Sequence, residues 1–252
     1  MSWTGDPVWL ADALREAGLR VIEHDGWRDR GHGDFGDLRG VLCHHTAGGG
    51  TDDWRIVEYG RPDLEGPLAQ LVLERDGTYR VIAVGVCWHA GRGSWPGWPT
   101  NNANYHTIGI EAVSRGDGTD WTPVQLDAYR RGCAAILRRI GRNADDCVAH
   151  REYSSEGKID PYGIDMDAFR ADVQALIDGE DAAMSAAEVT RIQDFITAFC
   201  GPISSDVKDI REQLCGQGQR DGAEYAGWPQ LGNRTLVDAI AEALTRLEKL
   251  EK

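Results

Sequence analysis

The sequence predicts an α/β fold in which helices flank a mixed central β-sheet, followed by a small helical module at the C-terminal end. Three observations support this prediction. Short segments of strand character recur through the first 150 residues, and several are apolar throughout, which is typical of strands buried on both faces. Amphipathic helical patterns lie before, between and after these segments. Beyond residue 179 the strand signals stop and only helical periodicities remain.

The first predicted element is a helix over residues 6–18, DPVWLADALREAG. Asp6 stands at its capping position and Pro7 at its first helical position, where the missing backbone N–H costs nothing. Six predicted strands follow, and their ranges are 19–24, 39–44, 67–74, 79–85, 107–113 and 146–150. Apolar runs such as LAQLVLE and YRVIAV predict that helices cover both faces of the resulting sheet.

The clearest helix separates the last two strands, in the segment TPVQLDAYRRGCAAILRRIG. Thr122 is a good capping residue and Pro123 follows it, as at many helix starts. One face is apolar at helical spacing, and its members are Leu126, Tyr129, Cys133, Ile136, Leu137 and Ile140. A further helix, DMDAFRADVQALIDG, is expected to close the first domain.

An acidic, alanine-rich stretch, GEDAAMS, divides the chain. The predicted division is a first domain at residues 1–178, a linker at 179–184 and a helical C-terminal module at 185–252. The capping box of Ser185 with Glu188 predicts a helix at the start of the module. Gly201 and Pro202 are expected to end this helix.

Two narrow apolar seams follow in the module. One seam comprises Ile203, Val207, Ile210 and Leu214, and the other comprises Val237, Ile240, Leu244 and Leu247. Seams of this width do not form a core by themselves within a short tail. We therefore expect them to pack on each other, on the first domain, or on a second copy of the chain in a homo-oligomer.

Composition and charge exclude several classes of partner. The 252 residues are 41% hydrophobic, which is ordinary for a globular protein. The formal charge of -14 argues against nucleic acid and against anionic lipid, because both demand a basic surface. Sugars and peptides are not excluded, since hydrogen bonds and aromatic stacking hold them. Trp88, Trp95 and Trp98 suit a groove of that kind.

The sequence carries no sign of export or membrane insertion. No run approaches the roughly 18 to 20 apolar residues of a membrane-spanning helix, and the first residues lack the basic start and apolar core of a secretory signal. The six cysteines include no CxxC pair, which is typical of buried thiols in a reducing compartment. We expect synthesis in a cytoplasm and no disulfide framework.

His44, His150 and Asp160 form the candidate chemical site. Two neutral imidazoles and a carboxylate suit a catalytic zinc ion, because three protein ligands leave the fourth tetrahedral position open for water. Both histidines end short apolar segments, GVLCH and DCVAH, where functional side chains often project. Lys158 stands two residues before Asp160 and suits stabilisation of an oxyanion. Strand alternation predicts that Cys43 points away from this site.

Four ordered segments carry a resemblance to a known family: CHHTAGG, PLAQLVLERDGTYRVIAVGVCWHAG, NYHTIGIEAV and AHREYSSEGKIDP. The chain resembles the type 2 N-acetylmuramoyl-L-alanine amidases, which include phage endolysins, bacterial muropeptide amidases and peptidoglycan recognition proteins. The resemblance covers roughly residues 35 to 170 and is strongest to the amidase domains of endolysins from actinobacterial phages. It implies the mixed-sheet fold of that family.

The resemblance also implies the ligands of one catalytic zinc ion. They fall on His44, His150 and Asp160, and Asp160 stands where many relatives carry a cysteine. His45 is then a neighbour of the site and not a ligand.

Four further residues are implied to act on the substrate. Glu111 of TIGIEAV takes the acid/base role, and Lys158 stabilises the transition state. His89 and Asn104 are expected to bind the substrate. Some phage amidases carry a catalytic tyrosine just before the RDGT strand, where this chain reads LAQ. Proton transfer is therefore expected to rest more heavily on Glu111.

Three hypotheses of function remain open. The first is an endolysin-type N-acetylmuramoyl-L-alanine amidase, which hydrolyses the amide bond between N-acetylmuramic acid and L-alanine of peptidoglycan with zinc-activated water and so lyses the host cell. Its C-terminal module is then expected either to bind the wall or to self-associate. The second is a non-catalytic peptidoglycan-binding protein, and the third is a zinc-stabilised structural protein. A zinc endopeptidase acting on the stem peptide is the nearest enzymatic rival. The complete set of ligands and catalytic residues favours the first.

An endolysin of this kind is expected in the host bacterial cytoplasm before release and at the cell wall afterwards. Because the wall lies outside the membrane, the protein would depend on a membrane-permeabilising partner.

Overall fold

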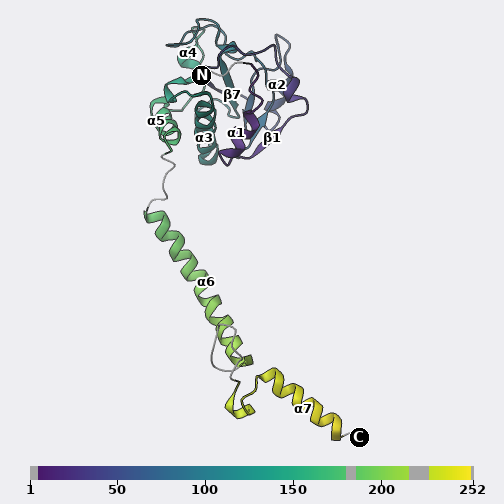
Figure 1. The fold of residues 1–252 in the computed structure, drawn as a ribbon. Helices are drawn as coiled ribbons and strands as arrows, with labels where there is room; N and C mark the ends of the chain where they lie inside the picture. Colours follow the sequence, from purple (N-terminus) through teal and green to yellow (C-terminus); the bar gives the residue numbers. More distant parts are fainter. Residues whose placement is uncertain (1–4, 180–185, 216–226, 251–252) are drawn as a thin grey trace. The chain divides into compact units, whose positions relative to one another are not determined.

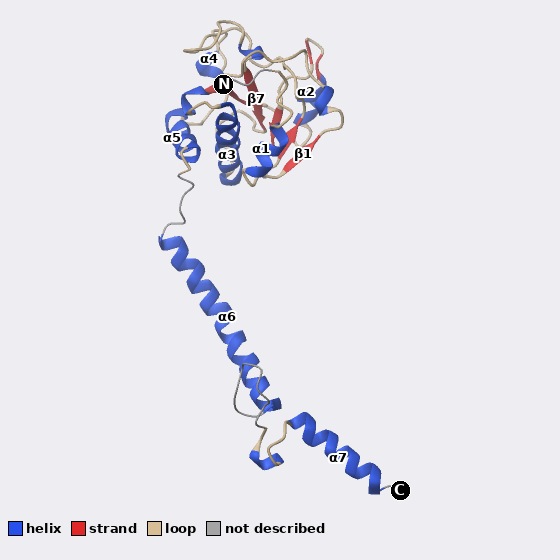
Figure 2. Cartoon of the chain, viewed as in Figure 1, coloured by secondary structure: helices blue, strands red, loops and turns tan. Residues whose placement is uncertain are grey.

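The computed structural model describes residues 5–179, 186–215 and 227–250, and the chain divides into two compact units, Met1–Ala182 and Ala183–Lys252 (Figure 1). Among the described residues, all strands lie in the first unit, and the second unit is helical (Figure 2).

A six-stranded mixed sheet forms the centre of the first unit, in the order β1-β6-β5-β7-β2-β8. β5 and β6 pair antiparallel, and all other neighbours pair parallel. The strands are β1 (Val21–Glu23), β2 (Gly40–His45), β5 (Leu71–Leu73), β6 (Tyr79–Val81), β7 (Thr107–Ala112) and β8 (Cys147–Ala149). Each predicted strand segment overlaps one of them, and the predicted fold class is confirmed.

One face of the sheet carries the main hydrophobic core under α1 (Leu10–Glu16), α3 (Pro123–Ile140) and α5 (Met166–Ile177). α3 begins as predicted, because the Gln125 amide donates to Thr122 Oγ1 at 3.1 Å. Its predicted apolar face is buried, except for a half-buried Leu126. α3 and α5 pack against one another and against the sheet, and so form the helical layer on this face.

The N-terminal helix is shorter than predicted. α1 starts at Leu10, because the Val8 amide donates to the Asp6 carbonyl and the Leu10 amide to the Pro7 carbonyl, both at 2.9 Å, in a turn. This turn buries Trp9, which is 5% exposed. Burial of a large indole therefore outweighs the local capping signal of Asp6.

Shorter pieces cover the opposite face of the sheet. α2 (Asp53–Tyr59) brings Val57 onto a cluster with Val72 of β5. α4 (His150–Tyr153) brings Tyr153 onto Leu42 of β2. The sequence did not predict α2 or the hairpin of β3 (Gly60–Arg61) and β4 (Leu64–Glu65), which are too short to show a period. Four 3-10 turns complete the described elements: η1 (Trp27–Asp29), η2 (Ala103–Tyr105), η3 (Ala144–Asp146) and η4 (Pro229–Leu231).

In the second unit, α6 (Ala186–Cys215) runs without a break through Gly201 and Pro202. The prediction that this pair ends the helix was wrong. A proline removes one helical hydrogen bond, but the apolar spacing continues past it from Ile196 to Ile203, so the helical period is kept. The capping residue Ser185 lies outside the described residues, as do the side chains of the first part of α6.

α7 (Leu236–Leu250) is capped by Thr235, whose Oγ1 accepts the Asp238 amide at 3.1 Å. The two predicted seams lie on α6 and α7, and their side chains are exposed within the single chain. On α6, Ile210 is 60% exposed, and on α7, Leu244 is 56% exposed. No helix of the described ranges combines the length and the apolar character that a membrane span requires.

Candidate metal centre

His44 is the penultimate residue of β2 and is held from two sides. Its carbonyl lies 3.0 Å from the Tyr129 hydroxyl of α3. Its backbone pairs in register with Glu111 on the parallel strand β7. Because paired residues of neighbouring strands project to the same face, this register places the Glu111 side chain beside His44. Cys43, the residue before, points to the opposite face as predicted.

His150 and Asp160 reach the same place through a short helix and its following loop. His150 is the first residue of α4, directly after β8. The Arg151 amide donates to the Asp160 carbonyl at 2.8 Å, which ties the loop back to α4. Glu152 binds the Arg170 guanidinium of α5 at 2.8 and 3.0 Å and anchors α4 to the helical layer.

The three predicted ligands converge on one point. His44 Nδ1 lies 3.1 Å from His150 Nδ1 and 2.9 Å from Asp160 Oδ2, and His150 Nδ1 lies 3.0 Å from Asp160 Oδ2. All three residues are buried to 9% exposure or less. Two nitrogen atoms and one oxygen atom, from three separate segments of the chain, thus lie close enough together to bind one small cation.

The hydrogen bonds of the outer nitrogens show that this donor set fits zinc. His150 Nε2 lies 3.0 Å from the Ala90 carbonyl, which can only accept. His150 Nε2 therefore carries the proton, and its Nδ1 lone pair faces the cluster. Two imidazole nitrogens and one carboxylate oxygen are ordinary zinc ligands that leave a position for water.

The charges of the cluster agree with a cation site. Burial lowers the pKa of His44, and the neighbouring His150 lowers it further, so His44 is a neutral imidazole at pH 7. Burial opposes ionisation of Asp160. Hydrogen bonds to His150 and His44 outweigh burial, and they hold the pKa of Asp160 well below its ordinary value. The site thus presents a neutral imidazole at His44 and a fixed negative charge at Asp160.

Glu111 lies beside the cluster with one oxygen unsatisfied. Its Oε2 is buried and has no hydrogen-bond partner among the described residues. Burial and the charge of Asp160 raise the pKa of Glu111 to about 8, while Lys158 acts in the opposite direction. A cation held by the three ligands would also lower this pKa. Glu111 is therefore suited to take up and release a proton near neutral pH.

An open groove runs over the cluster. It contains a cavity of about 450 Å³ whose lining includes all three ligands with Glu111 and Lys158. A second cavity of about 440 Å³ adjoins it and shares Trp88, His89 and Lys158. The predicted catalytic and ligand residues therefore share one solvent-accessible space.

His89 and Asn104 both lie at this groove. His89 is 8% exposed, and its Nδ1 lies 3.1 Å from His44 Nε2. Asn104 lines the second cavity, and its Oδ1 accepts the amides of His89 at 3.0 Å and Ala90 at 2.8 Å. His45 Nδ1 accepts the Tyr162 amide at 3.1 Å, and His45 is absent from the donor cluster.

The tryptophan prediction holds for one residue of three. Trp88 lines both cavities of the groove. Trp98 is 6% exposed and its Nε1 donates to Asp146 Oδ1 at 2.9 Å, so it is a core residue and its prediction as a groove residue was wrong. Trp95 Nε1 donates to the Asp145 carbonyl at 3.0 Å, and its ring packs against the apolar cluster that contains Trp98. In a loop, buried and exposed side chains follow no fixed period, so the sequence alone did not show which of the three tryptophans faces the groove.

Sequence reasoning missed the β3–β4 hairpin at the groove. Arg61 and Leu64 of this hairpin line the ligand cavity. Leu68 also lines it, in the LAQ segment where some phage amidases carry tyrosine. Gln70 of that segment is fully buried and donates to the Gly85 carbonyl at 3.0 Å, so it is structural.

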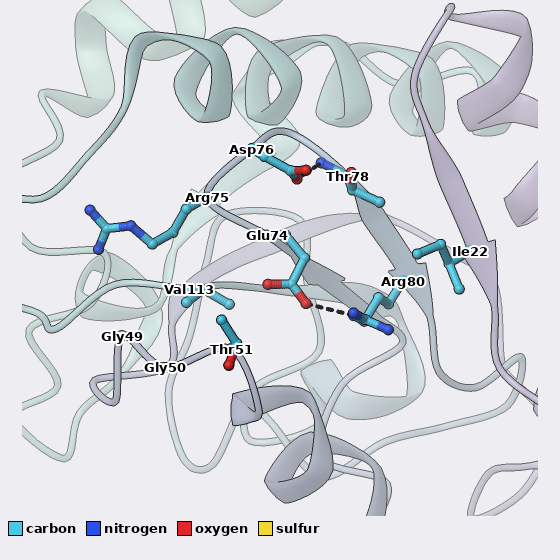
Figure 3. A pocket seen from close by; sticks show the side chains of 10 residues that line it. All are labelled: Ile22, Gly49, Gly50, Thr51, Glu74, Arg75, Asp76, Thr78, Arg80 and Val113. Carbon is cyan, nitrogen blue, oxygen red and sulfur yellow. Dashed lines mark hydrogen bonds and ion pairs between the residues drawn. The ribbon is translucent and has the colours of Figure 1, made fainter.

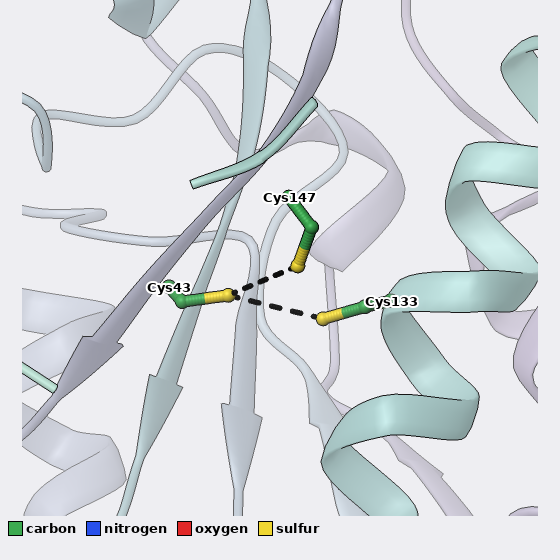
Figure 4. A group of neighbouring side chains, drawn as sticks. All are labelled: Cys43, Cys133 and Cys147. Carbon is green, nitrogen blue, oxygen red and sulfur yellow. Dashed lines mark hydrogen bonds between the residues drawn. The ribbon is translucent and has the colours of Figure 1, made fainter. Parts of the chain in front are cut away.

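A second cluster of possible ligands lies in the core below the sheet. Cys43 Sγ lies 3.8 Å from Cys133 Sγ and 3.7 Å from Cys147 Sγ (Figure 4). All three are buried among the apolar residues of the main core. Burial raises the pKa of Cys133 well above its ordinary value, which favours the neutral thiol. We interpret this cluster as packed thiols with no opening for substrate.

A separate hollow of about 300 Å³ lies near β1 and the β5–β6 turn (Figure 3). Its charged side chains have partners within the protein: Arg80 Nε lies 2.5 Å from Glu74 Oε1, and Asp76 Oδ1 accepts the Thr78 amide at 3.0 Å. None of the predicted site residues lines it. The groove over the three ligands is therefore the candidate active site.

Comparisons with known proteins agree with the sequence motifs. Residues 34–163 match the family model described as N-acetylmuramoyl-L-alanine amidase, and residues 183–250 match one described as Rv3766 C-terminal domain. No curated protein sequence matches the chain.

Several solved structures are similar in fold. A selenomethionine derivative of AmpD is 20% identical, over 61% of this chain and 93% of its own, with a TM-score of 0.45. AmiD of E. coli, solved with the substrate anhydro-N-acetylmuramic acid-L-Ala-D-gamma-Glu-L-Lys, is 19% identical over 57% of this chain and 60% of its own, with a TM-score of 0.43. A mutant endolysin from Bacillus subtilis is 20% identical over 62% of this chain and 99% of its own, with a TM-score of 0.45.

Proposed function

Because the chain belongs to the N-acetylmuramoyl-L-alanine amidase family, we propose that it hydrolyses the amide bond between N-acetylmuramic acid and L-alanine of bacterial peptidoglycan with one zinc ion. One observation carries the proposal. The donor atoms of His44, His150 and Asp160 lie about 3 Å apart on the floor of an open groove, and Glu111 and Lys158 line the same cavity.

The residues of the groove divide the chemistry among them. A zinc ion bound by the three ligands would acidify water and polarise the scissile carbonyl. Glu111 is placed to take a proton from the attacking water and to return it to the departing amine, because its Oε2 is buried beside the ligands and has no partner within the described ranges. Lys158 lies on the exposed side and supplies a positive charge as the carbonyl oxygen becomes negative.

Digestion of purified peptidoglycan, followed by mass spectrometry of the fragments, tests the reaction. Intact stem peptides and glycan free of peptide are expected, and a chelator should stop their release until zinc is restored. The Glu111→Gln variant is the matched control, because it keeps the shape of the side chain. Cleavage within the stem would show a zinc endopeptidase. Binding of the wall without any fragment would show a non-catalytic binding protein.

We further propose that the protein acts as an endolysin of a bacteriophage. It would be made in the host bacterial cytoplasm, reach the wall through lesions made by a membrane-permeabilising partner, and lyse the host. The strong negative charge and the groove over the site suit a wall glycopeptide better than nucleic acid. Lysis of host cells from outside, after chemical permeabilisation of the outer layers where present, tests this role.

The C-terminal module supports a further proposal, pairing with a second copy of the chain. Ile203, Val207, Ile210 and Leu214 of α6 follow the spacing of a two-stranded coiled coil and are 42 to 60% exposed. Asp206 precedes Val207 in this repeat, and Arg211 follows Ile210. In a parallel pair these two flanking positions face each other across the seam, with opposite charges. Lys208 and Glu212 bind each other at 3.9 Å on the outer face.

A further inference from the structure

The segment His89–Ala90 contacts both histidine ligands from behind. His44 uses Nδ1 toward the ligand cluster, and its Nε2 lies 3.1 Å from His89 Nδ1. His150 uses Nδ1 in the same way, and its Nε2 lies 3.0 Å from the Ala90 carbonyl. Two consecutive residues therefore meet the outer nitrogens of two ligands that are 106 positions apart in the sequence.

The proton positions follow from this geometry. A histidine that binds a cation through Nδ1 carries its proton on Nε2, so His44 must donate to its outer partner. His89 Nδ1 is the atom within reach, and it must then be the acceptor. The Ala90 carbonyl is an acceptor in any state. The Ala90 carbonyl thus selects the tautomer of His150 that can hold a cation, and His89 with an unprotonated Nδ1 is the matching partner for that tautomer of His44.

Asn104 fixes this segment. Its Oδ1 accepts the His89 amide at 3.0 Å and the Ala90 amide at 2.8 Å, so one amide oxygen sets the position of both partners. A further residue leaves room for the His89 ring. A Cβ added to Gly109 on β7 would lie 2.9 Å from His89 Cγ and Nδ1, which is closer than side chains tolerate.

We infer that His89 and Asn104 are positioning residues of the metal centre: His89 accepts the Nε2 proton of His44, and Asn104 holds the His89–Ala90 segment against both ligand histidines. This inference rests on the proposed zinc chemistry. It assigns Asn104 to the metal centre, where the family resemblance implied substrate binding. Gly109 serves the same arrangement by leaving space for the ring.

Zinc affinity of the full-length protein, measured by competition with a fluorescent chelator, tests the inference. Loss of a residue that hydrogen-bonds a metal ligand typically weakens metal binding about 10- to 100-fold. We expect a loss of that size for Asn104→Ala and for His89→Phe, which keeps a ring but removes the acceptor. Asn104→Asp keeps an oxygen acceptor for both amides and is expected to restore most of the affinity. His89→Asn, which places an acceptor near the position of Nδ1, should do the same.

Thermal unfolding of the zinc-free variants separates positioning from folding. Asn104→Ala loses the acceptor of two amides, so its melting temperature is expected to fall, and a cooperative transition well above the assay temperature shows that the fold is kept. Substitution of cobalt adds a spectroscopic check, because a displaced histidine ligand changes the intensity of the visible bands. If the parent protein binds zinc and Asn104→Ala binds it equally well with an unchanged cobalt spectrum, the inference is wrong. If the parent itself fails to bind zinc, the proposed function falls instead.

Discussion

The fold holds Glu111 at a position where the charged form of its carboxylate is unfavourable. The expected effect of replacing it follows from that position. Glu111 occupies a strand position in register with His44, yet its Oε2 has no hydrogen-bond partner in the part of the chain that the structure describes. We expect Glu111→Ala to lower turnover of peptidoglycan by about 10²- to 10⁴-fold, the usual contribution of a positioned acid or base. Zinc content should stay at one ion per chain, because Glu111 is not among the converging donors. Metal analysis of the purified variant decides this point, and loss of zinc would move Glu111 into the ligand set.

Lys158 is expected to act on the transition state and not on the metal. Its side chain is exposed and lines both cavities of the groove. Lys158→Ala should lower kcat by about 10²- to 10³-fold, with a smaller change in KM, since the oxyanion forms only during reaction. Steady-state kinetics on a soluble muropeptide measures the two constants. A rise in KM alone would show that Lys158 binds the ground state of the substrate.

The sequence predicted where chemistry lies better than it predicted what each side chain touches. His44 and His150 were predicted from residue type and strand-end position and Asp160 from residue type, because metal ligands need specific atoms, and the family resemblance implied the same three ligands. The hydrogen bond of Asn104 to the His89–Ala90 segment was not foreseeable. It joins a loop to a short turn without periodic pattern, and such contacts depend on the folded path of the chain.

At the scale of elements, long periodic segments were predicted well and short or interrupted ones poorly. α3 has a capping residue, a first-turn proline and an apolar face, and all three agree. The start of α1 was placed too early because burial of Trp9 overrode the Asp6 signal. At Gly201 and Pro202 the local signal for a helix end was outweighed by the continuing period of α6.

The connection between β7 and α3 depends on one buried carboxylate, Asp120. Burial alone would raise its pKa, but hydrogen bonds from Ser114, the Arg115 amide and Arg75 lower the pKa to about 2. The folded-state pKa thus lies below the ordinary value of 3.8. The stabilisation from ionised Asp120 is complete above about pH 4 and is lost as the pH falls toward 2.

Asp120→Asn should therefore destabilise the zinc-free protein at pH 6 and much less near pH 2. A loss of about 1.5 to 3 kcal/mol is expected at pH 6, the range for hydrogen bonds to charged groups. Urea unfolding of both proteins across this pH range, with a chelator present, gives the two curves. A difference in unfolding free energy that stays constant with pH would exclude ionisation of Asp120 as the cause.

At the scale of the whole molecule, the candidate active site and the exposed apolar seams lie in different units. All predicted ligands and groove residues lie within Met1–Ala182, and the exposed seams lie within Ala183–Lys252. An apolar stripe on a charged helix is costly to leave in water, at about 25 cal/mol for each Å² of apolar surface. Pairing of two α6 helices would bury this stripe.

We therefore expect the full chain to run as a dimer in light scattering and the chain truncated after Gly179 to run as a monomer. Ile210→Asn, which puts an amide into the middle of the seam, should shift the full chain toward monomer because a buried polar group weakens such interfaces. Asp209→Asn, one position away and outside the seam, is the matched control and should leave the dimer intact. The truncated chain should still cleave a soluble muropeptide, since it retains every ligand. If light scattering shows one copy per particle for both the full and the truncated chain, self-association is refuted. The amidase proposal is unaffected by that result.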